Sequence, residues 1–400
     1  CMAAAGIIAE YNPLHLGHCC QLRRLRALLG EETPVICAMS GNFVQRGDFA
    51  LLGKHARAEA AVRSGADLVL EIPLSWACAP AERFAQGGVE VLLGTGLVTD
   101  LVFGSESADA GAIRSATEAL LGPDFPEALR RELAGPHSFA AARQRALAGL
   151  IGEEGAEVLS RPNDILAVEY AKALSREGSE VHLVPILRQG AGHDQDGGEY
   201  PSAGSIRRMI QEGRRAEALA AMAPAMREIY EAEEARGRAP VFAAGAERAI
   251  LAQLRRMGEA DFLALDAGGE GLGNRLAAAA REAASLEEVL DRAKTKRYAY
   301  SRLRRLALWA YLGLRPETLP ARVPYLRPLA MNQRGRALLA EARRRGALPI
   351  LTKPADVRRL TPEAQAVFRR EVLATDLYTL AFPGDPAPGG AEWREGPRVL

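Results

Sequence analysis

The sequence predicts an α/β domain built on a parallel sheet, followed by an all-helical C-terminal domain. Short apolar runs rich in β-branched residues alternate with helical patterns through the first two hundred residues, which is typical of βαβ units. From about residue 216 onward the apolar spacing is helical, and no strand longer than four residues is expected. We therefore divide the chain into an α/β domain, residues 2–215, and a helical domain, residues 216–400.

The elements of the first half follow from local patterns. The apolar run that begins at Gly6 predicts the first strand, and Asn12-Pro13 ends it because a residue before proline is disfavoured in the helical region. Ligands of parallel sheets bind beyond the carboxyl ends of the strands, so the site is expected in the loops that follow them. The further expected strands are residues 34–40, 67–72, 98–104 and 180–187, and the expected helices are residues 19–29, 54–64, 81–93, 164–174 and 205–212.

The second half shows only helical patterns. The expected helices are residues 214–236, 244–257, 274–293, 298–314, 332–346 and 361–376. Residues 109–160, within the first half, are also expected to be helical but irregular.

Composition excludes several classes of protein. Apolar residues make up 48% of the 400 residues, enough for a packed core and too many for a disordered chain. No run of eighteen apolar residues occurs and no secretory signal is evident, so neither a membrane nor export is expected. The cysteines within residues 19–78 form no C-x-x-C pair, which argues against structural zinc and disulfides and favours the cytoplasm. The formal net charge of +1 does not by itself indicate a nucleic-acid partner.

The most informative motif lies where the first strand gives way to a helix. His15 and His18 stand three residues apart at the first helical turn, where two side chains can share one face. The helix N-terminus offers unpaired N–H groups and a positive dipole to a phosphate, and Gly17 lets a ligand approach the backbone. The pattern predicts a nucleoside-triphosphate site that includes the two histidines. Histidines that merely cap the helix are the alternative.

Four further residues fall at the same expected edge of the sheet. Arg46 lies in a loop between two glycines and could clamp a phosphate or a carboxylate. Gly104 ends a strand where a base or ribose could lie against the backbone, and Asn163 opens a helix where its amide could bind adenine or ribose. Arg188 directly follows the last strand, where a phosphate is expected. The alternatives are an ordinary surface loop for Arg46, a turn for Gly104, a helix cap for Asn163 and a solvated side chain for Arg188.

Two segments resemble known signatures. The H-x-G-H motif resembles that of the HIGH superfamily of nucleotidyltransferases and class I aminoacyl-tRNA synthetases. This resemblance implies a Rossmann-like sheet and adenylyl transfer with loss of pyrophosphate, with His15 and His18 as the catalytic groups. Residues 201–208 resemble the second signature of this superfamily, which implies possible phosphate contacts from Ser202, Ser205 and Arg207. Ala203 and Gly204 depart from that pattern, because hydroxyl residues are common at those places. A serine-capped helix is the alternative.

Two basic clusters occur in the helical half. Arginines and lysines interleaved with tyrosines suit RNA phosphates and stacked bases. A solvated helix face, enriched in arginine by a coding bias, is the alternative. The candidate RNA contacts are Lys294, Lys296, Arg297, Arg302, Arg305, Arg334 and Arg336.

Taken in order, the motifs are similar to those of the tRNA(Met) cytidine acetate ligase family. They are GIIAEYNPLHLGH, AMSGNFVQRGD, GADLVLEIP, FGSE, RPNDILAVEY and PSAGSIR, and the resemblance spans roughly residues 2–210. It implies that ATP activates acetate as acetyl-adenylate, and that the acetyl group passes to N4 of the wobble cytidine of elongator tRNA(Met). The ATP-binding residues that it implies are Ile7, Ile8, Ala9, Glu10, Tyr11, Asn12, Pro13, Leu14, His15, Leu16, Gly17, His18, Cys19, Cys20, Gly104, Asn163 and Arg188.

Several points stay open at this stage. Mg²⁺ is plausible as a partner of the triphosphate, but no protein ligand for a metal can be named. Nothing in the sequence indicates an oligomeric state. A small-molecule adenylyltransferase and a non-catalytic RNA-binding protein with a residual nucleotide pocket remain as alternative functions.

Overall fold

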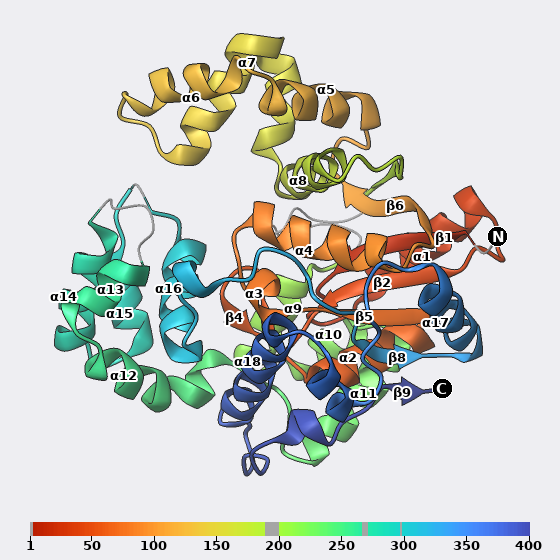
Figure 1. Ribbon diagram of the computed structural model, residues 1–400. Coiled ribbons are helices and arrows are strands. Elements are labelled where there is room, and N and C mark those ends of the chain that lie inside the picture. The colour runs from red at the N-terminus through yellow and green to blue at the C-terminus, as the bar shows by residue number, and fades with distance from the viewer. Residues whose placement is uncertain (1–2, 189–199, 266–270, 297) are drawn as a thin grey trace.

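The computed structural model describes residues 3–188, 200–265, 271–296 and 298–400, and its centre is a seven-stranded sheet (Figure 1). The strands are β1 (Ala4–Ala9), β2 (Val35–Ser40), β5 (Leu68–Ile72), β6 (Val98–Ser105), β7 (His182–Leu187), β8 (Pro328–Met331) and β9 (Arg398–Val399). Their order is β7-β6-β1-β2-β5-β8-β9. The first five strands in this order are parallel, and β8 is antiparallel to β5. The expected α/β domain with a parallel sheet is therefore confirmed.

Helices cover both faces of the sheet because its central strands are apolar on both sides. Every residue of β2 and β5 is buried. Ile8 and Ile36 pack on one side under α4 (Ala81–Gly94) and α8 (Pro162–Arg176), whereas Ile7 and Cys37 pack on the other under α1 (Leu16–Leu29) and α2 (Lys54–Arg63). Further helices on these layers are α3 (Leu74–Ala77), α9 (Ala203–Gln211), α10 (Arg215–Ala221) and α11 (Pro224–Ala235).

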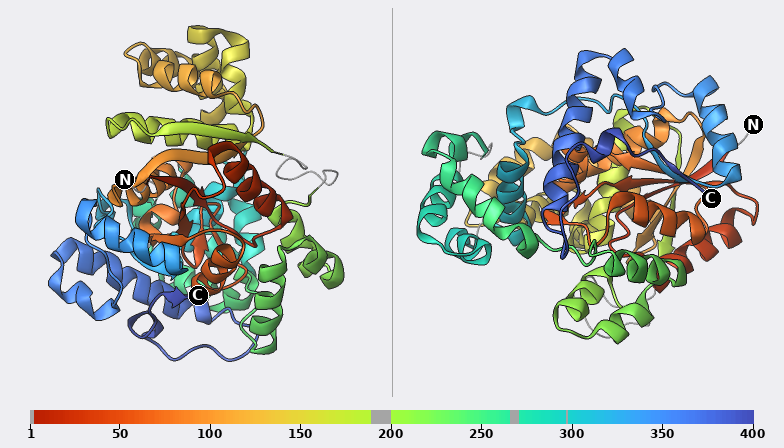
Figure 2. Two further views of the ribbon diagram at one scale, coloured as in Figure 1. Left: turned by 90° about the vertical axis from the view of Figure 1, so that its right-hand side faces the viewer. Right: turned by 90° about the horizontal axis from the view of Figure 1, so that it is seen from below.

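Two groups of helices extend away from the sheet. One is an insertion between β6 and α8, which stands off the sheet in two of the views (Figures 1 and 2). The other is a helical body whose core includes Leu254, Leu276 and Leu303 and also contains Phe43 and Phe49 from the segment after β2. The insertion comprises α5 (Ala110–Leu121), α6 (Phe125–Leu133) and α7 (Phe139–Ala156), with η1 (Glu157–Ser160) after it. The helical body comprises α12 (Glu247–Arg256), α13 (Glu259–Leu265), α14 (Leu272–Glu282), α15 (Leu286–Ala293) and α16 (Tyr300–Leu312), preceded by η2 (Ala243–Ala246).

The second half is mostly helical, as expected, but it also returns to the sheet. β8 and β9 form one side of the sheet, so residues 216–400 are not all-helical. These strands have four and two residues, too few for a periodic pattern to reveal them. The other elements of this half are η3 (Pro316–Thr318), α17 (Gln333–Arg345), η4 (Pro354–Arg359), α18 (Pro362–Thr379) and η5 (Ala391–Trp393). Within the described ranges, no helix is long and apolar enough to cross a membrane.

A buried charge cluster joins the C-terminal segment to the sheet. Lys54 Nζ lies 2.7 Å from a carboxylate oxygen of Glu71 on β5 and 2.7 Å from one of Glu392 in η5. Arg327 Nη2 lies 3.0 Å from Glu392. Burial opposes ionisation of Glu392, but Lys54 and Arg327 attract its carboxylate more strongly, so its pKa is lowered.

One buried arginine ties together the carboxyl ends of β1 and β2. Arg57 on α2 is fully buried, and its Nε donates to the carbonyl of Leu52 at 3.0 Å. Its Nη atoms donate to the carbonyls of Glu10, Ser40 and Gly41. Burial lowers the pKa of Arg57 to about 10, which leaves the guanidinium charged at neutral pH.

We predict that Arg57→Met lowers the free energy of unfolding by about 3 kcal/mol or more, because several buried carbonyls lose a charged donor. Urea denaturation followed by circular dichroism measures this loss. Arg63→Met on the same helix is the matched control, since Arg63 is exposed and pairs with Glu228, a type of contact worth about 0–1 kcal/mol. Equal losses in the two variants would contradict the role assigned to Arg57.

Candidate active site

The two histidines of the H-x-G-H motif cap α1. His15 is the N-cap residue, and its Nδ1 accepts the N–H of Gly17 at 3.1 Å. His18 Nδ1 accepts the N–H of His15 at 3.2 Å, and the two rings lie 3.8 Å apart between centroids. Because each Nδ1 accepts a hydrogen bond, the proton of each neutral imidazole is assigned to Nε2. The same side chains can therefore cap the helix through Nδ1 and bind a ligand through Nε2–H.

Both imidazoles are neutral at pH 7. Burial lowers the pKa of His15 to about 3, with a smaller effect from the nearby charge of Arg188. Burial also lowers the pKa of His18 well below its usual value. The two rings thus present N–H donors without a positive charge.

The loop before the histidines is held in an unusual conformation. Tyr11 has a φ of 47°, which is uncommon for a residue with a side chain, and its ring meets that of His18 edge-on at 5.0 Å. Tyr11 Oη lies 3.7 Å from Cys37 Sγ, and Asn12 Oδ1 accepts the N–H of Leu51 at 2.7 Å. These contacts anchor the loop between β1 and α1.

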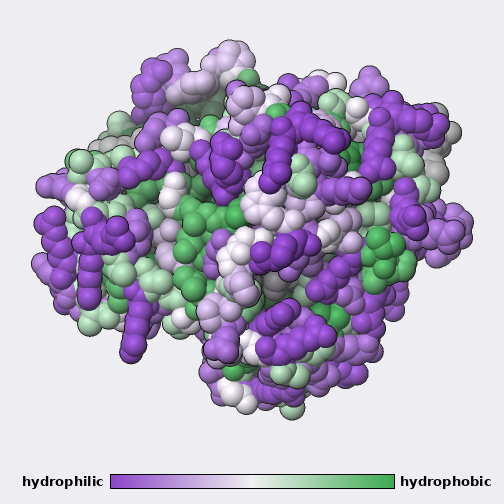
Figure 3. Space-filling model, turned by 60° about the horizontal axis from the view of Figure 1, so that its bottom comes forward, coloured by the Kyte–Doolittle hydropathy of each residue, from purple (hydrophilic) through white to green (hydrophobic). Residues whose placement is uncertain are grey.

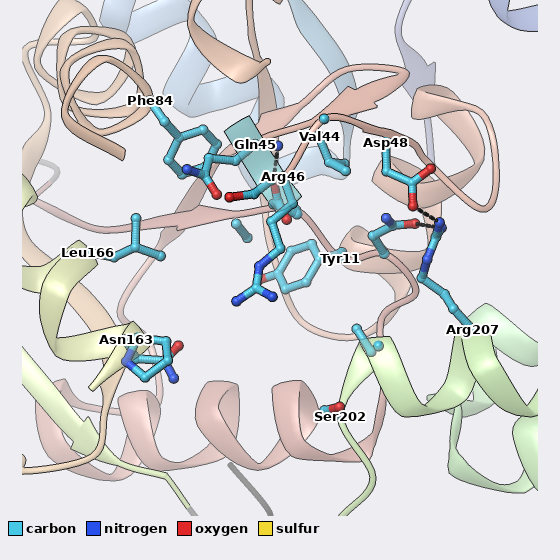
Figure 4. A pocket seen from close by; sticks show the side chains of 18 of the residues that line it. Tyr11, Val44, Gln45, Arg46, Asp48, Phe84, Asn163, Leu166, Ser202 and Arg207 are labelled. Carbon is cyan, nitrogen blue, oxygen red and sulfur yellow. Dashed lines mark hydrogen bonds and ion pairs between the residues drawn. The ribbon is translucent and has the colours of Figure 1, made fainter. Parts of the chain in front are cut away.

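One cavity of about 1070 Å³ lies at the carboxyl ends of β1, β6 and β7 (Figure 4). It brings together His15, His18, Gly104, Asn163 and Arg188, although they are far apart in sequence. Other expected nucleotide-binding residues that line it are Ile7, Ile8, Ala9, Glu10, Tyr11, Asn12, Gly17 and Cys20. Of the described residues that were expected there, Pro13, Leu14, Leu16 and Cys19 do not line it.

Asn163 and Arg188 belong to one polar chain on the cavity wall. Arg188 Nη1 donates to Asn163 Oδ1 at 2.7 Å, and Asn163 Nδ2 donates to Glu106 Oε1 at 2.6 Å. A side chain at Gly104 would come within 3.1 Å of Arg188 Cγ, so glycine leaves room for the arginine. Asp164 accepts the backbone N–H groups of Glu106 and Ser107 at 3.1 Å, and thereby shapes the loop after β6.

The remaining phosphate candidates have different environments. The side chain of Arg46 reaches into the cavity near Tyr11 (Figure 4). Arg207 also lines the cavity, but it pairs with Asp48 at 2.6 Å and donates to Asn12 Oδ1 at 3.2 Å, so it connects two loops. Ser202 caps α9 and lines the cavity, whereas Ser205 is buried and is not among the lining residues that the structure describes.

A short hairpin joins the sheet to the helical body. It is formed by β3 (Phe43–Val44) and β4 (Asp48–Phe49), and its N–H at Gln45 donates to Glu10 Oε1 at 2.7 Å. Arg305 on α16 donates to the carbonyl of Gln45 at 3.1 Å. Gly47 has a φ of 77°, and a Cβ there would lie 2.4 Å from the backbone nitrogen of Arg305. The tip of the hairpin therefore packs directly against α16.

The two basic clusters lie at opposite ends of the sheet strands. Lys294, Lys296, Arg302 and Arg305 lie on α16 or just before it, whereas Arg334 and Arg336 lie on α17 (Figure 1). The start of α17 packs at the amino end of β5, where Gly335 would clash with the carbonyl of Asp67 if it had a Cβ. Arg334 also pairs with Glu32 at 2.6 Å. Arg297 lies outside the described residues.

Sequence reasoning did not identify Arg57, Asp48, Glu106 or Asp164 as residues that shape the site. Their partners are backbone groups or side chains distant in sequence, so no local pattern marks them. The loops that contain Asp48 and Glu106 were nevertheless identified, because each follows an apolar strand.

Comparisons with known proteins agree with this geometry. The HIGH Nucleotidyl Transferase family matches residues 2–389. The tRNA(Met) cytidine acetate ligase of Fervidobacterium nodosum is 34% identical, over 96% of this chain and 95% of that protein. The ligase of the same name from Thermotoga petrophila is 36% identical, over 94% of each chain.

Solved structures show the same fold over the whole chain. The crystal structure of Thermotoga maritima TmcAL bound with alpha-thio ATP has a TM-score of 0.93 and 33% identity, and covers 100% of both chains. The apo form of that protein has a TM-score of 0.95. With the histidine pair on α1 and relatives matched over nearly their full length, the chain belongs to the tRNA(Met) cytidine acetate ligase family of HIGH nucleotidyl transferases.

Proposed function

We propose that this chain is an ATP-dependent ligase that acetylates N4 of the wobble cytidine of elongator tRNA(Met) through acetyl-adenylate. The observation that carries the proposal is the pair of neutral imidazoles at the N-terminus of α1, on the wall of a cavity shared with Arg46, Asn163 and Arg188. The relative whose structure contains alpha-thio ATP has this fold over its full length, which supports ATP as the substrate.

The first step of the proposed reaction needs donors for developing negative charge. The acetate oxygen attacks the α-phosphorus, a new P–O bond forms, and pyrophosphate leaves. The Nε2–H groups of His15 and His18, together with the positive end of α1, stabilise the charge on the α-phosphate and the leaving group. Acetate is a weak nucleophile, so its confinement beside the phosphorus supplies much of the rate.

The second step transfers the acetyl group. The N4 amine of the cytidine attacks the acyl carbon, the C–O bond to the phosphate breaks, and AMP leaves while N4 loses a proton. We assign the polar chain of Asn163 and Arg188 to the nucleotide, because it lies on the same wall as the histidines. Arg46 is the candidate for a phosphate or for the acetate carboxylate.

We expect Mg²⁺ to accompany the triphosphate. Among the described residues, no group of three or more His, Cys, Asp or Glu side chains could hold a metal ion. Mg²⁺ usually keeps several waters and binds substrate phosphates with only one or two carboxylates, so it does not require such a group. The substrates of this reaction are cytoplasmic, so we propose that compartment for the protein.

We assign tRNA binding to the helical part of residues 216–400, and chiefly to the cluster around α16. This cluster adjoins the cavity, since Tyr300 and Arg304 of α16 line it. Arg334 and Arg336 lie at the amino end of β5, and Glu32 already compensates the charge of Arg334. We therefore expect them to contribute less to tRNA affinity.

We predict that His15→Asn and His18→Gln each slow acetate-dependent pyrophosphate release from ATP by roughly a hundredfold or more, the scale of losing one transition-state donor. Both variants should keep their thermal stability, because asparagine at the N-cap and glutamine three residues later preserve the two capping hydrogen bonds. His182→Asn is the matched control, since His182 is an exposed histidine at the start of β7 and does not line the cavity. Full activity in the first two variants would disprove the catalytic assignment.

We predict that His15 makes stability depend on pH. Its pKa is about 3 in the folded chain, against about 6.5 when unfolded, so only the unfolded chain takes up a proton between these values. Stability is therefore complete above pH 6.5 and falls as the pH is lowered. Urea denaturation at pH 7 and pH 5.5 should show a loss about 1 kcal/mol larger in the wild type than in His15→Asn. Equal losses would show that His15 does not titrate in this way.

We predict that the double variant Lys296→Gln and Arg302→Gln weakens tRNA binding and reduces the slope of log affinity against log salt by about 1 to 2, because phosphate contacts release counterions. Binding assays at several salt concentrations measure the slope. The double variant Arg334→Gln and Arg336→Gln serves as the comparison and should change the slope less. A larger effect in this second variant would place the RNA at the amino end of β5.

A further inference from the structure

We propose that the part of the cavity bounded by α12, α15 and α16 binds the acceptor cytosine base, unstacked from its neighbours in the RNA. We call this part the helical wing, and define it by Phe242, Glu247, Ile250, Leu290, Tyr300 and Arg304, all of which line the cavity. The inference rests on the proposed ligase function and adds the place where the acceptor is bound.

The helical wing is a built surface of three helices. On α16 the lining residues are Tyr300, Ser301, Arg304, Ala307 and Leu308, a spacing that puts them on one face. On α12 and α15 the lining residues include Glu247, Ile250 and Leu290, again spaced for one face of each helix. Each of the three helices thus turns one face toward the cavity that the histidines also line.

The chemistry of the helical wing suits a flat amino-bearing base. Ile250 and Leu290 are buried and form an apolar floor. Tyr300 is 37% exposed and offers the exposed part of its ring for stacking, with Lys294 Nζ 5.7 Å from the ring centre. Glu247 is half-buried; its Oε1 accepts the N–H of Leu286 at 3.0 Å, and a carboxylate is the usual acceptor for the N4 amine of cytosine. The guanidinium of Arg304 lies 5.7 Å from the centre of the Tyr300 ring and supplies positive charge for an adjacent phosphate.

The size of the cavity leaves room for a second substrate. Its volume of about 1070 Å³ exceeds the roughly 300–1,000 Å³ typical of a site for one small ligand. Acetyl transfer requires N4 and the acyl carbon to meet, so the base must enter the cavity that holds the adenylate. Enzymes that act on a base inside structured nucleic acid take the base out of its stack, which also fits a cavity with an aromatic wall.

The helical wing is held in place relative to the histidines. The hairpin tip at Gly47 packs on the backbone of α16, and Arg305 donates to Gln45. Arg207, which contacts the loop at Asn12, lies 5.2 Å from the centre of the Phe242 ring. Apolar surface is visible along the junction between the helical body and the rest of the molecule (Figure 3). The contacts of Gly47, Arg305 and Arg207 connect the helical wing to the hairpin and to the loop at Asn12.

A photo-crosslinking experiment tests the location directly. The probe is tRNA(Met) with 4-thiouridine at the wobble position, where sulfur replaces the N4 amine, irradiated with the full chain and ATP. We expect crosslinks to peptides that contain residues 242–250 or 300–308. Crosslinks confined to other peptides, for example those of α7 or α17, would overturn the proposal.

A comparison of the two half-reactions tests the stacking role. Tyr300→Ala should lower kcat/KM for acetyl transfer to tRNA roughly 10-fold to 100-fold more than it lowers acetate-dependent pyrophosphate release, the scale of losing one base–aromatic stack. Tyr300→Phe keeps the ring and should restore transfer. Equal effects on both half-reactions would overturn the proposal. A wild-type protein that releases pyrophosphate but never acetylates tRNA would instead refute the proposed function.

Discussion

The loops that form the candidate active site depend on a single buried guanidinium. Arg57 reaches from α2 beneath the carboxyl ends of β1 and β2 and gives hydrogen bonds to carbonyls of Glu10, Ser40 and Gly41. Carbonyls at strand ends that turn away from the sheet have no ladder partner and would otherwise be buried unpaired. A charged donor with a fixed fork geometry satisfies several of them at once. Arg57 therefore fixes the positions of both the loop that contains the histidines and the loop after β2.

The hairpin of β3 and β4 extends this arrangement to the second half of the chain. Gln45 contacts Glu10 through its N–H and Arg305 through its carbonyl, so one residue touches both the end of β1 and α16. Asp48 holds Arg207, which in turn contacts Asn12. The cavity is consequently lined by residues that lie up to three hundred positions apart in the sequence. Hydrogen bonds and ion pairs connect the segments that carry these residues.

The sequence was sufficient for the parallel core and for the histidine motif, because both rest on local signals. Alternation of apolar runs with helical patterns located β2, β5, β6 and β7 within a few residues of their bounds. β8 and β9 could not be found, since strands of four and two residues carry no period. The sequence also could not show that Arg302 and Arg334 lie far apart, because both belong to basic clusters on helices. They lie at opposite ends of the strands because β8 pairs with β5 and brings α17 to the amino end of that strand. The same holds for Arg207, whose partner Asp48 was recognisable in sequence only as part of a loop.

The buried pair of Lys54 and Glu392 has a consequence for synthesis of the protein on the ribosome. Lys54 is made early, on the helix that carries Arg57, whereas Glu392 is made more than three hundred residues later. Until then the ammonium group has only part of its buried negative partners, and β9, which follows Glu392 in the chain, has not been made. A buried charge without its full complement of partners opposes closure of the layer that contains it. The cavity at the strand ends is thus expected to form fully only at the end of translation, which leaves a long interval in which chaperones can bind the unfinished sheet.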